Sequence, residues 1–225
     1  ICTVSKHLKE KKEALYNIKN IFELNNAIDS DLFSKTKENK IKYNYNKVVG
    51  FVGNIKNYID FDLIIYLAKK RKDVQFVIIG FNPNEEIKNK TKELNNIIFE
   101  GNKKYEELPK YIKSFDIGII PYKVDDTHIK SISPMKLYEY LACNIFVLSS
   151  PIPDVVNFKI NSNMGTYVEI ANNYNEFLEK LDSLIVRDKF QLTEEEIYTI
   201  SWEKRFSDLF EELNKLGIIE YNKKS

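Results

Sequence analysis

The chain has 225 residues, with 34 Lys and Arg against 33 Asp and Glu, and a formal net charge of +1 at pH 7. This balance argues against a polyanion-binding protein, because nucleic-acid-binding domains usually carry a clear basic surplus. No apolar run approaches the roughly 18 residues that a membrane-spanning helix needs, and no stretch has the pattern of a signal peptide. Cys2 and Cys143 have no metal-binding or redox spacing, which favours a reducing cytoplasm. The glycines form neither a Gly-x-Gly-x-x-Gly nor a Walker phosphate loop.

The first forty residues do not begin a domain. They combine a Lys-rich helical stretch around 7–20, a turn-rich segment at 25–31, and the start of a polar linker over 34–46. Because the chain also starts with Ile, we expect it to be part of a longer protein.

Apolar strands alternate with helices from residue 48 onward. The expected strands are 48–53, 75–80, 97–99, 116–121, 145–149 and 166–170, and the expected helices are 60–71, 85–94, 108–114, 134–142 and 174–187. Asp60 is the expected N-cap of the first of these helices. Ser201 is the expected N-cap of a final helix, which carries an apolar stripe from Trp202 to Leu216 and stops at Gly217.

Continuous apolar strands between helices are typical of a parallel sheet covered on both faces. We therefore predict an α/β fold with a doubly wound parallel sheet, a Rossmann-like domain over 41–190. Ligands of such sheets bind beyond the carboxyl ends of the strands. The segments expected around that crevice are 53–58, 80–84, 101–105, 122–134 and 149–154.

The most informative segment runs from Ser131 to Ala142. Ser133 as N-cap and Pro134 at the first helical position predict a well-defined helix start. The unpaired N–H groups of such a start suit a phosphate. Lys136 could neutralise a diphosphate, and Glu139 could accept hydrogen bonds from a vicinal diol such as a ribose. The alternative is that Lys136 and Glu139 form an exposed i,i+3 ion pair.

The pattern Pro134-x-Lys136-x-x-Glu139-Tyr140-Leu141-Ala142, followed by a buried strand and Ser149-Ser150-Pro151-x-Pro153, resembles a known family. It is similar to the donor-binding half of bacterial GT-B glycosyltransferases of the retaining group 1 kind, especially those that build teichuronic-acid, capsular and other surface polysaccharides. Asn25-Asn26-Ala27-Ile28-Asp29 resembles the hinge of that family. Gly50-Phe51-Val52-Gly53 resembles the first strand of its second domain, and Ser201-Trp202 the start of its final helix.

The resemblance implies a domain organisation. Residues 1–40 are then the tail of the N-terminal domain and the interdomain hinge, and 41–190 the nucleotide-sugar-binding Rossmann-like domain. Residues 191–225 are then a C-terminal helix that packs back on an N-terminal domain lying outside this chain.

The resemblance also implies a function. The chain is expected to be the donor-binding part of a hexosyltransferase-type enzyme that moves a sugar to a saccharide or lipid-linked acceptor in cell-surface polysaccharide synthesis, inactive as this fragment alone. The expected donor is a nucleotide-diphosphate sugar, with no cofactor and no metal. The expected location is cytoplasmic, at the inner face of the membrane, with peripheral membrane contact and no nucleic-acid partner.

The resemblance assigns roles in donor binding but no catalytic residue. Glu139 is expected at the ribose, the start of the helix at the diphosphate, and Ser131 near the transferred sugar. The full set of expected donor-binding residues is Gly53, Asn54, Lys56, Lys103, Tyr105, Tyr122, Ser131, Ser133, Met135, Lys136 and Glu139.

The chain departs from the family pattern at two positions that the family uses for donor contacts. The family often has two Glu residues separated by seven positions, and Ser131 stands at the first of them. Asn54 stands where Arg is common, and the nearest cation, Lys56, comes two residues later. These departures favour an alternative, a catalytically degenerate GT-B half that acts as a binding or interaction module. A sugar-nucleotide epimerase of the same fold is a third reading, but it needs acid and base residues that the sequence does not reveal.

A few other residues could carry chemistry. Asp125, Asp126 and His128 could suggest a metal site, but a solvated acidic loop is the favoured interpretation. Trp202 is expected to pack rather than to bind a ligand, and Cys143 is expected to be a small core residue.

Overall fold

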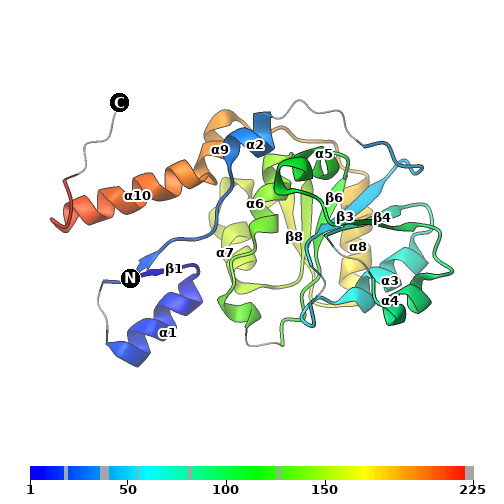
Figure 1. The fold of residues 1–225 in the computed structure, drawn as a ribbon, viewed down its shortest axis with the longest axis horizontal. Coiled ribbons are helices and arrows are strands. Elements are labelled where there is room, and N and C mark those ends of the chain that lie inside the picture. The colour runs from blue at the N-terminus through cyan, green and yellow to red at the C-terminus, as the bar shows by residue number, and fades with distance from the viewer. Residues whose placement is uncertain (18–19, 36–40, 55, 81–82, 126–127, 221–225) are drawn as a thin grey trace.

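The computed structural model describes residues 1–17, 20–35, 41–54, 56–80, 83–125 and 128–220. Its centre is a six-stranded parallel sheet with the strand order β5-β4-β3-β6-β7-β8 (Figure 1). The strands are β3 (Val48–Val52), β4 (Gln75–Ile79), β5 (Ile97–Gly101), β6 (Ile117–Ile120), β7 (Phe146–Ser149) and β8 (Val168–Ile170). This architecture confirms the predicted doubly wound α/β fold. The domain boundaries drawn at 40 and 190 remain predictions.

Helices cover both faces of the sheet. They are α3 (Phe61–Lys70), α4 (Glu85–Thr91), α5 (Leu108–Ile112), α6 (Met135–Ala142), α7 (Pro153–Asn161) and α8 (Tyr174–Ile185). Single turns of tighter helix lie at Tyr105–Glu107 (η1), Ile129–Ser131 (η2) and Asn163–Tyr167 (η3). The chain winds from β3 towards β5 and then from β6 towards β8, so right-handed crossovers place α3 and α6 on opposite faces. The reversal between β3 and β6 is the topological switch point, where such sheets bind ligands.

The two ends of the described chain pack together. The N-terminal segment holds β1 (Cys2–Thr3), α1 (Lys6–Tyr16), β2 (Phe22–Glu23) and α2 (Ser30–Lys35), and the C-terminal segment holds α9 (Glu194–Thr199) and α10 (Trp202–Lys215). Ile28 bridges to Ser201, and its carbonyl accepts from the Trp202 N–H at 3.1 Å. In Figure 1, α10 extends away from the sheet on the side where β1 and α1 also lie.

Two predicted caps are confirmed. The Asp60 carboxylate accepts from the Leu63 N–H at 3.0 Å at the start of α3. The Ser201 hydroxyl accepts from the Lys204 N–H at 3.2 Å at the start of α10. Trp202 packs on Phe206, as expected. Within the described residues, none of the helices combines the length and the apolar character that crossing a membrane requires.

Three helices were not predicted. The helix α2 lies in sequence interpreted as turn and linker, and only Phe33 of its six residues is buried. The helix α7 begins at Pro153 and continues with the β-branched pair Val155-Val156, which favours strands. The six-residue α9 is too short to show a periodic pattern, although a capping box of Thr193 and Glu196 marks its start.

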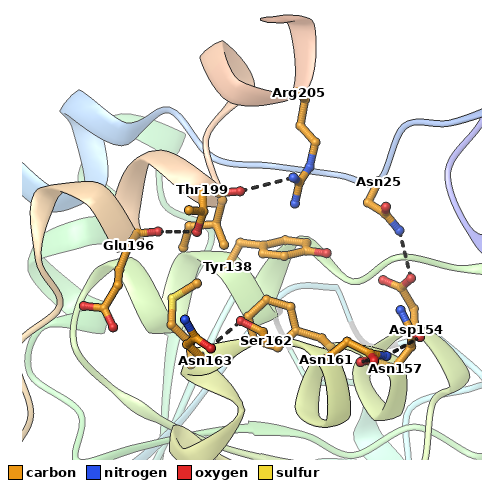
Figure 2. Close-up of a pocket in the computed structure, with 13 residues that line it drawn as sticks. Asn25, Tyr138, Asp154, Asn157, Asn161, Ser162, Asn163, Glu196, Thr199 and Arg205 are labelled. Atoms are coloured by element: carbon orange, nitrogen blue, oxygen red, sulfur yellow. Dashed lines mark hydrogen bonds between the residues drawn. The ribbon is translucent and has the colours of Figure 1, made fainter. Parts of the chain in front are cut away.

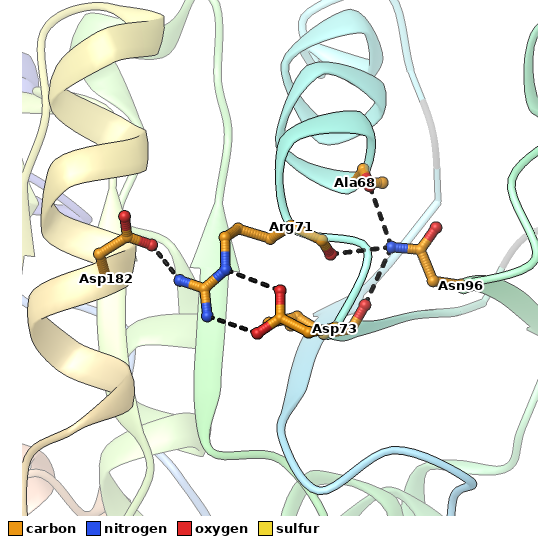
Figure 3. Close-up of polar contacts among 6 residues, drawn as sticks. Ala68, Arg71, Asp73, Asn96 and Asp182 are labelled. Carbon is orange, nitrogen blue, oxygen red and sulfur yellow. Dashed lines mark hydrogen bonds and ion pairs between the residues drawn. The ribbon is translucent and has the colours of Figure 1, made fainter.

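A polar network fixes the end of α3 to the sheet and to α8 (Figure 3). The buried Asn96 amide donates to the carbonyls of Ala68, Arg71 and Val74, each at 3.0 Å. The Arg71 guanidinium donates to Asp73 at 2.9 and 2.8 Å and pairs with Asp182 on α8. Satisfied polar groups of this kind close the end of a helix that would otherwise leave buried carbonyls unpaired.

Bare backbone on β6 lets α6 lie close to the sheet. A Cβ on Gly118 would come within 2.2 Å of the Tyr140 ring, so only glycine fits there. The Tyr140 hydroxyl reaches across β6 and accepts from the Val52 N–H at 3.0 Å. This contact anchors α6 at the carboxyl end of β3, beside the switch point.

Candidate functional site

Three of the predicted donor-binding residues meet at the switch point. Gly53 follows β3 and Tyr122 follows β6. The Lys136 ammonium donates to the Tyr122 hydroxyl at 3.0 Å. A Cβ on Gly53 would lie 2.9 Å from that ammonium, so the absence of a side chain at Gly53 lets the Lys136 ammonium lie close to the backbone there. In the part of the chain that the structure describes, no carboxylate pairs with Lys136, which leaves a positive charge at the edge where ligands bind.

The start of α6 differs from the prediction. The helix begins at Met135, and Pro134, with φ −72° and ψ 116°, occupies the N-cap position without a side-chain cap. The prediction that Ser133 caps this helix is therefore wrong. Ser133 is instead buried beside Asp154, and its carbonyl accepts from the Asn26 amide at 2.6 Å. Because no side chain among the described residues caps α6, the N–H groups of Met135 and Lys136 at its start are left for another acceptor, whereas the Leu137 N–H donates to the Pro134 carbonyl at 3.2 Å. The Met135 side chain lies partly exposed beside them.

Glu139 is 5% exposed, and its carboxylate forms no hydrogen bond or ion pair among the described residues. The alternative of an exposed ion pair with Lys136 is therefore wrong. Burial raises the pKa of Glu139 to about 7, and the nearby Lys136 charge opposes that shift. Burying a carboxylate without a hydrogen-bond partner costs free energy of folding. Such a residue is therefore a candidate for a functional role.

The helix α2 supplies the cover over this side of α6. The fully buried Phe33 ring makes an edge contact with the Tyr105 ring, with 5.4 Å between the ring centroids. The backbone carbonyl of Phe33 accepts a hydrogen bond from the Cys143 thiol. Tyr105 is 38% exposed. Its pKa rises to about 12 through burial first and then through the charges of Glu139 and Asp29. Tyr105 therefore lies within electrostatic reach of Glu139.

The remaining predicted residues are more dispersed. Lys103 pairs with Glu100 at 3.1 Å and lies over the Tyr111 ring, and a hydrogen bond with Tyr111 is the largest cause of its raised pKa. Lys103 is therefore held within the domain. Asn54 and Lys56 are exposed on the loop after β3.

The N-terminal segment touches the loop before α6, a contact that the sequence did not predict. The Ser5 hydroxyl donates to the Ser131 carbonyl at 2.9 Å, as Asn26 does to Ser133. The only signal in the sequence was the hinge-like Asn25-Asn26 pair, and nothing in it indicated a contact with residues more than a hundred positions later.

A cavity of about 330 Å³ lies among the described residues at the carboxyl edge of the sheet. It is lined by Tyr122 and by residues after β7 and β8, among them Ser150, Pro151 and Tyr174. It adjoins the switch point through Tyr122. The Tyr174 hydroxyl donates to Asp60 at 2.8 Å across its wall.

A cavity of about 360 Å³ lies between α7, α9 and α10 and contains none of the predicted donor-binding residues (Figure 2). The Tyr138 ring lies across its middle, and the Asn25 amide donates to Asp154 at 2.9 Å at one end. Arg205 lies over the Tyr138 ring and donates to the Thr199 carbonyl at 3.1 Å. Burial is the main effect on Asp154 and raises its pKa to about 6.

Among the described residues, no three His, Cys, Asp or Glu side chains gather closely enough to hold a metal ion. Of the metal candidate named from the sequence, Asp126 lies outside the described residues. The expectation of metal-independent chemistry remains a prediction.

Comparison with known proteins identifies a family and a related protein. Residues 46–187 match the family model described as "Glycosyl transferases group 1". The chain is 29% identical over 156 residues to a Bacillus subtilis (strain 168) protein named "Putative teichuronic acid biosynthesis glycosyltransferase TuaH". That match covers 67% of this chain and 38% of the relative, so the chain spans about two fifths of the relative's length.

Solved structures share the fold over nearly the whole chain. Sucrose-phosphate synthase from Thermosynechococcus elongatus superposes with a TM-score of 0.67 at 12% identity, over 96% of this chain and 57% of that one. Anabaena HepE in complex with UDP-glucose gives a TM-score of 0.67 at 12% identity, over 95% of this chain and 63% of that one. At these identities the likeness concerns the fold alone.

Proposed function

The chain belongs to the group 1 glycosyl transferases, and on that premise we propose that it is the donor-binding half of a retaining GT-B glycosyltransferase. The enzyme transfers a sugar from a nucleotide-diphosphate sugar to a saccharide or lipid-linked acceptor in cell-surface polysaccharide synthesis. One observation supports this proposal above others. The helix that brings Lys136 to the switch point without an ion pair among the described residues also carries the buried Glu139 one turn later.

The positive charge of Lys136 suits the diphosphate of a nucleoside diphosphate, and the carboxylate of Glu139 suits its ribose. The Lys136 ammonium and the uncapped N–H groups of α6 bind the diphosphate, because both offer positive charge to an anion. Glu139 accepts hydrogen bonds from the ribose hydroxyls, which fill the bonding capacity that the fold leaves open. The half-exposed Tyr105, on the same side as Glu139, stacks on the base or sugar.

The side of the site that receives the transferred sugar is formed by Tyr122 and Ser131. Tyr122 lines the 330 Å³ cavity next to Lys136. We assign no catalytic residue and no metal to this chain. In this proposal the acceptor site and the catalytic groups belong to a domain outside these 225 residues.

The relatives support the substrate class and the setting. TuaH is named for teichuronic acid biosynthesis, and HepE was solved with UDP-glucose. A uridine diphosphate sugar is therefore the first donor to test. The proposed location is the cytoplasmic face of the membrane, where a lipid-linked acceptor would be reached.

Calorimetric titration with UDP, GDP, ADP and CMP tests this function. We expect one nucleotide to bind the wild-type chain, and Glu139→Ala to weaken that binding at least about tenfold, since a hydrogen-bonded charged group contributes about 1.5–3 kcal/mol. Glu179→Ala is the matched control, because Glu179 is exposed on α8. Unchanged affinity in Glu139→Ala would remove the ribose role. Failure of all four nucleotides to bind would favour the degenerate binding module.

A further inference from the structure

Three hydrogen bonds from the N-terminal segment converge on the loop before α6 and on the start of α7. The Ser5 hydroxyl donates to the Ser131 carbonyl at 2.9 Å, and the Asn26 amide donates to the Ser133 carbonyl at 2.6 Å. The Asn25 amide donates to Asp154 at 2.9 Å, a contact visible in Figure 2. The partners are 126, 107 and 129 residues apart, so the fold alone brings them together.

The loop over residues 131–134 is held by few backbone hydrogen bonds of its own. The Ser131 N–H donates to the His128 carbonyl at 3.1 Å, and the Ile132 N–H reaches the Ile129 carbonyl only at 3.4 Å. Pro134 has no N–H to donate. The bonds that the structure describes for the Ser131 and Ser133 carbonyls both come from the N-terminal segment.

These two carbonyls determine how the chain enters α6. The Ser131 carbonyl lies in the peptide plane between residues 131 and 132, and the Ser133 carbonyl lies in the plane between residues 133 and 134. Fixing both planes sets the direction in which Pro134 leads into Met135. The orientation of the first N–H groups of α6, and of Lys136 beyond them, follows from that direction. A binding site loses affinity when its groups deviate even slightly from the geometry that the ligand requires.

Ser5 links this loop to a second element. It is buried, and the same hydroxyl oxygen accepts from the Leu8 N–H at 3.3 Å as the N-cap of α1. The position of α1 and the position of the loop therefore depend on one side chain.

We propose that Asn26 and Ser5 are positioning residues of the donor site, which hold the 131–134 loop so that the start of α6 faces the diphosphate. This inference rests on the proposed function. It assigns the N-terminal segment a part in donor binding without any contact between that segment and the donor.

Nucleotide titration combined with amide hydrogen exchange tests the proposal on the 225-residue chain. In Asn26→Ala and Ser5→Ala we expect UDP, or whichever nucleotide the wild type binds, to bind about two- to tenfold more weakly, the effect of one lost hydrogen bond. Exchange in the segment 129–137, measured without nucleotide, should become faster. Ser5→Thr keeps the hydroxyl and should behave as the wild type.

Asn161→Ala is the matched control, because Asn161 is exposed and its amide also donates to a backbone carbonyl, that of Asn157, at 3.0 Å. It should change neither readout. Unchanged exchange at 129–137 in both variants would overturn the proposal, and so would an equal rise throughout the chain. If the wild type binds no nucleotide, the proposed function fails, and the exchange measurement still decides whether the two residues hold the loop.

Discussion

Glu139 is buried against the usual preference of carboxylates for water or a cation. Lys136 is close enough to lower its pKa, yet the two form no ion pair, because the ammonium is directed to Tyr122 instead. The fold therefore holds a buried carboxylate that has no ion pair or hydrogen bond among the described residues, and whose charge the nearby Lys136 offsets only in part. Residues that reduce stability in this way are concentrated at functional sites.

Glu139→Gln should make the protein more stable at pH 8. With a folded pKa of about 7 against the ordinary 4.5, ionisation at pH 8 costs at most about 3 kcal/mol that a neutral amide does not incur. The gain should shrink towards pH 4, where the carboxyl is protonated in both states. Urea unfolding at the two pH values measures it, with Glu179→Gln as the exposed control. Equal stability of variant and wild type at pH 8 would contradict the raised pKa.

The helix α6 is positioned from two sides. Tyr140 crosses Gly118 to reach Val52, and α2 covers the opposite flank through Phe33. The first contact requires a glycine in the strand, and the second requires a helix that lies far away in the sequence. Both are properties of elements rather than of single side chains.

Gly118→Ala should destabilise the fold by about 3 kcal/mol, because the new methyl group overlaps the Tyr140 ring and overpacking of a core is costly. Thermal unfolding measures the loss. Gly217→Ala, where nothing lies within 4 Å but φ is +67°, should cost only about 1 kcal/mol. If the two substitutions cost the same, the close approach of α6 to β6 is not what constrains Gly118.

Phe33→Ala should lower the pKa of Glu139 from about 7 towards 4.5. Removing the ring admits water beside a carboxyl whose pKa burial has raised, and the cavity should also cost about 3–5 kcal/mol. A carbon-13 NMR titration of the glutamate carboxyls measures the pKa. Phe177→Ala, buried on α8, is the control that should leave it unchanged. A Glu139 pKa that stays near 7 would show that α2 is not the cover.

At the scale of the whole molecule, two buried carboxyls should contribute a loss of stability as pH rises through the acidic range. Glu139 and Asp154 have folded pKa values of about 7 and about 6, above their ordinary values of 4.5 and 3.8. Between those values the unfolded chain binds fewer protons than the folded chain, so stability falls with pH, and above about pH 7 the loss is complete.

The double variant Glu139→Gln/Asp154→Asn should lack this part of the pH dependence. Chemical unfolding of both proteins between pH 4 and 8 gives the difference between their profiles, which should grow up to about pH 7 and then level off. Parallel profiles would show that neither carboxyl has a raised pKa in the folded chain.

The sequence by itself determined the α/β class, the positions of the six sheet strands along the chain and the starts of α3 and α10. These features depend on hydrophobic periodicity and capping residues that are neighbours along the chain. Only the tertiary structure decided the surroundings of Glu139, the entry into α6 and the contacts of Asn26. Each of those depends on packing between segments far apart in sequence, where α2 and the N-terminal segment meet α6. Local propensity carries no information about such contacts, so Ser133 looked like a cap and Glu139 could equally have been an exposed ion-pair partner.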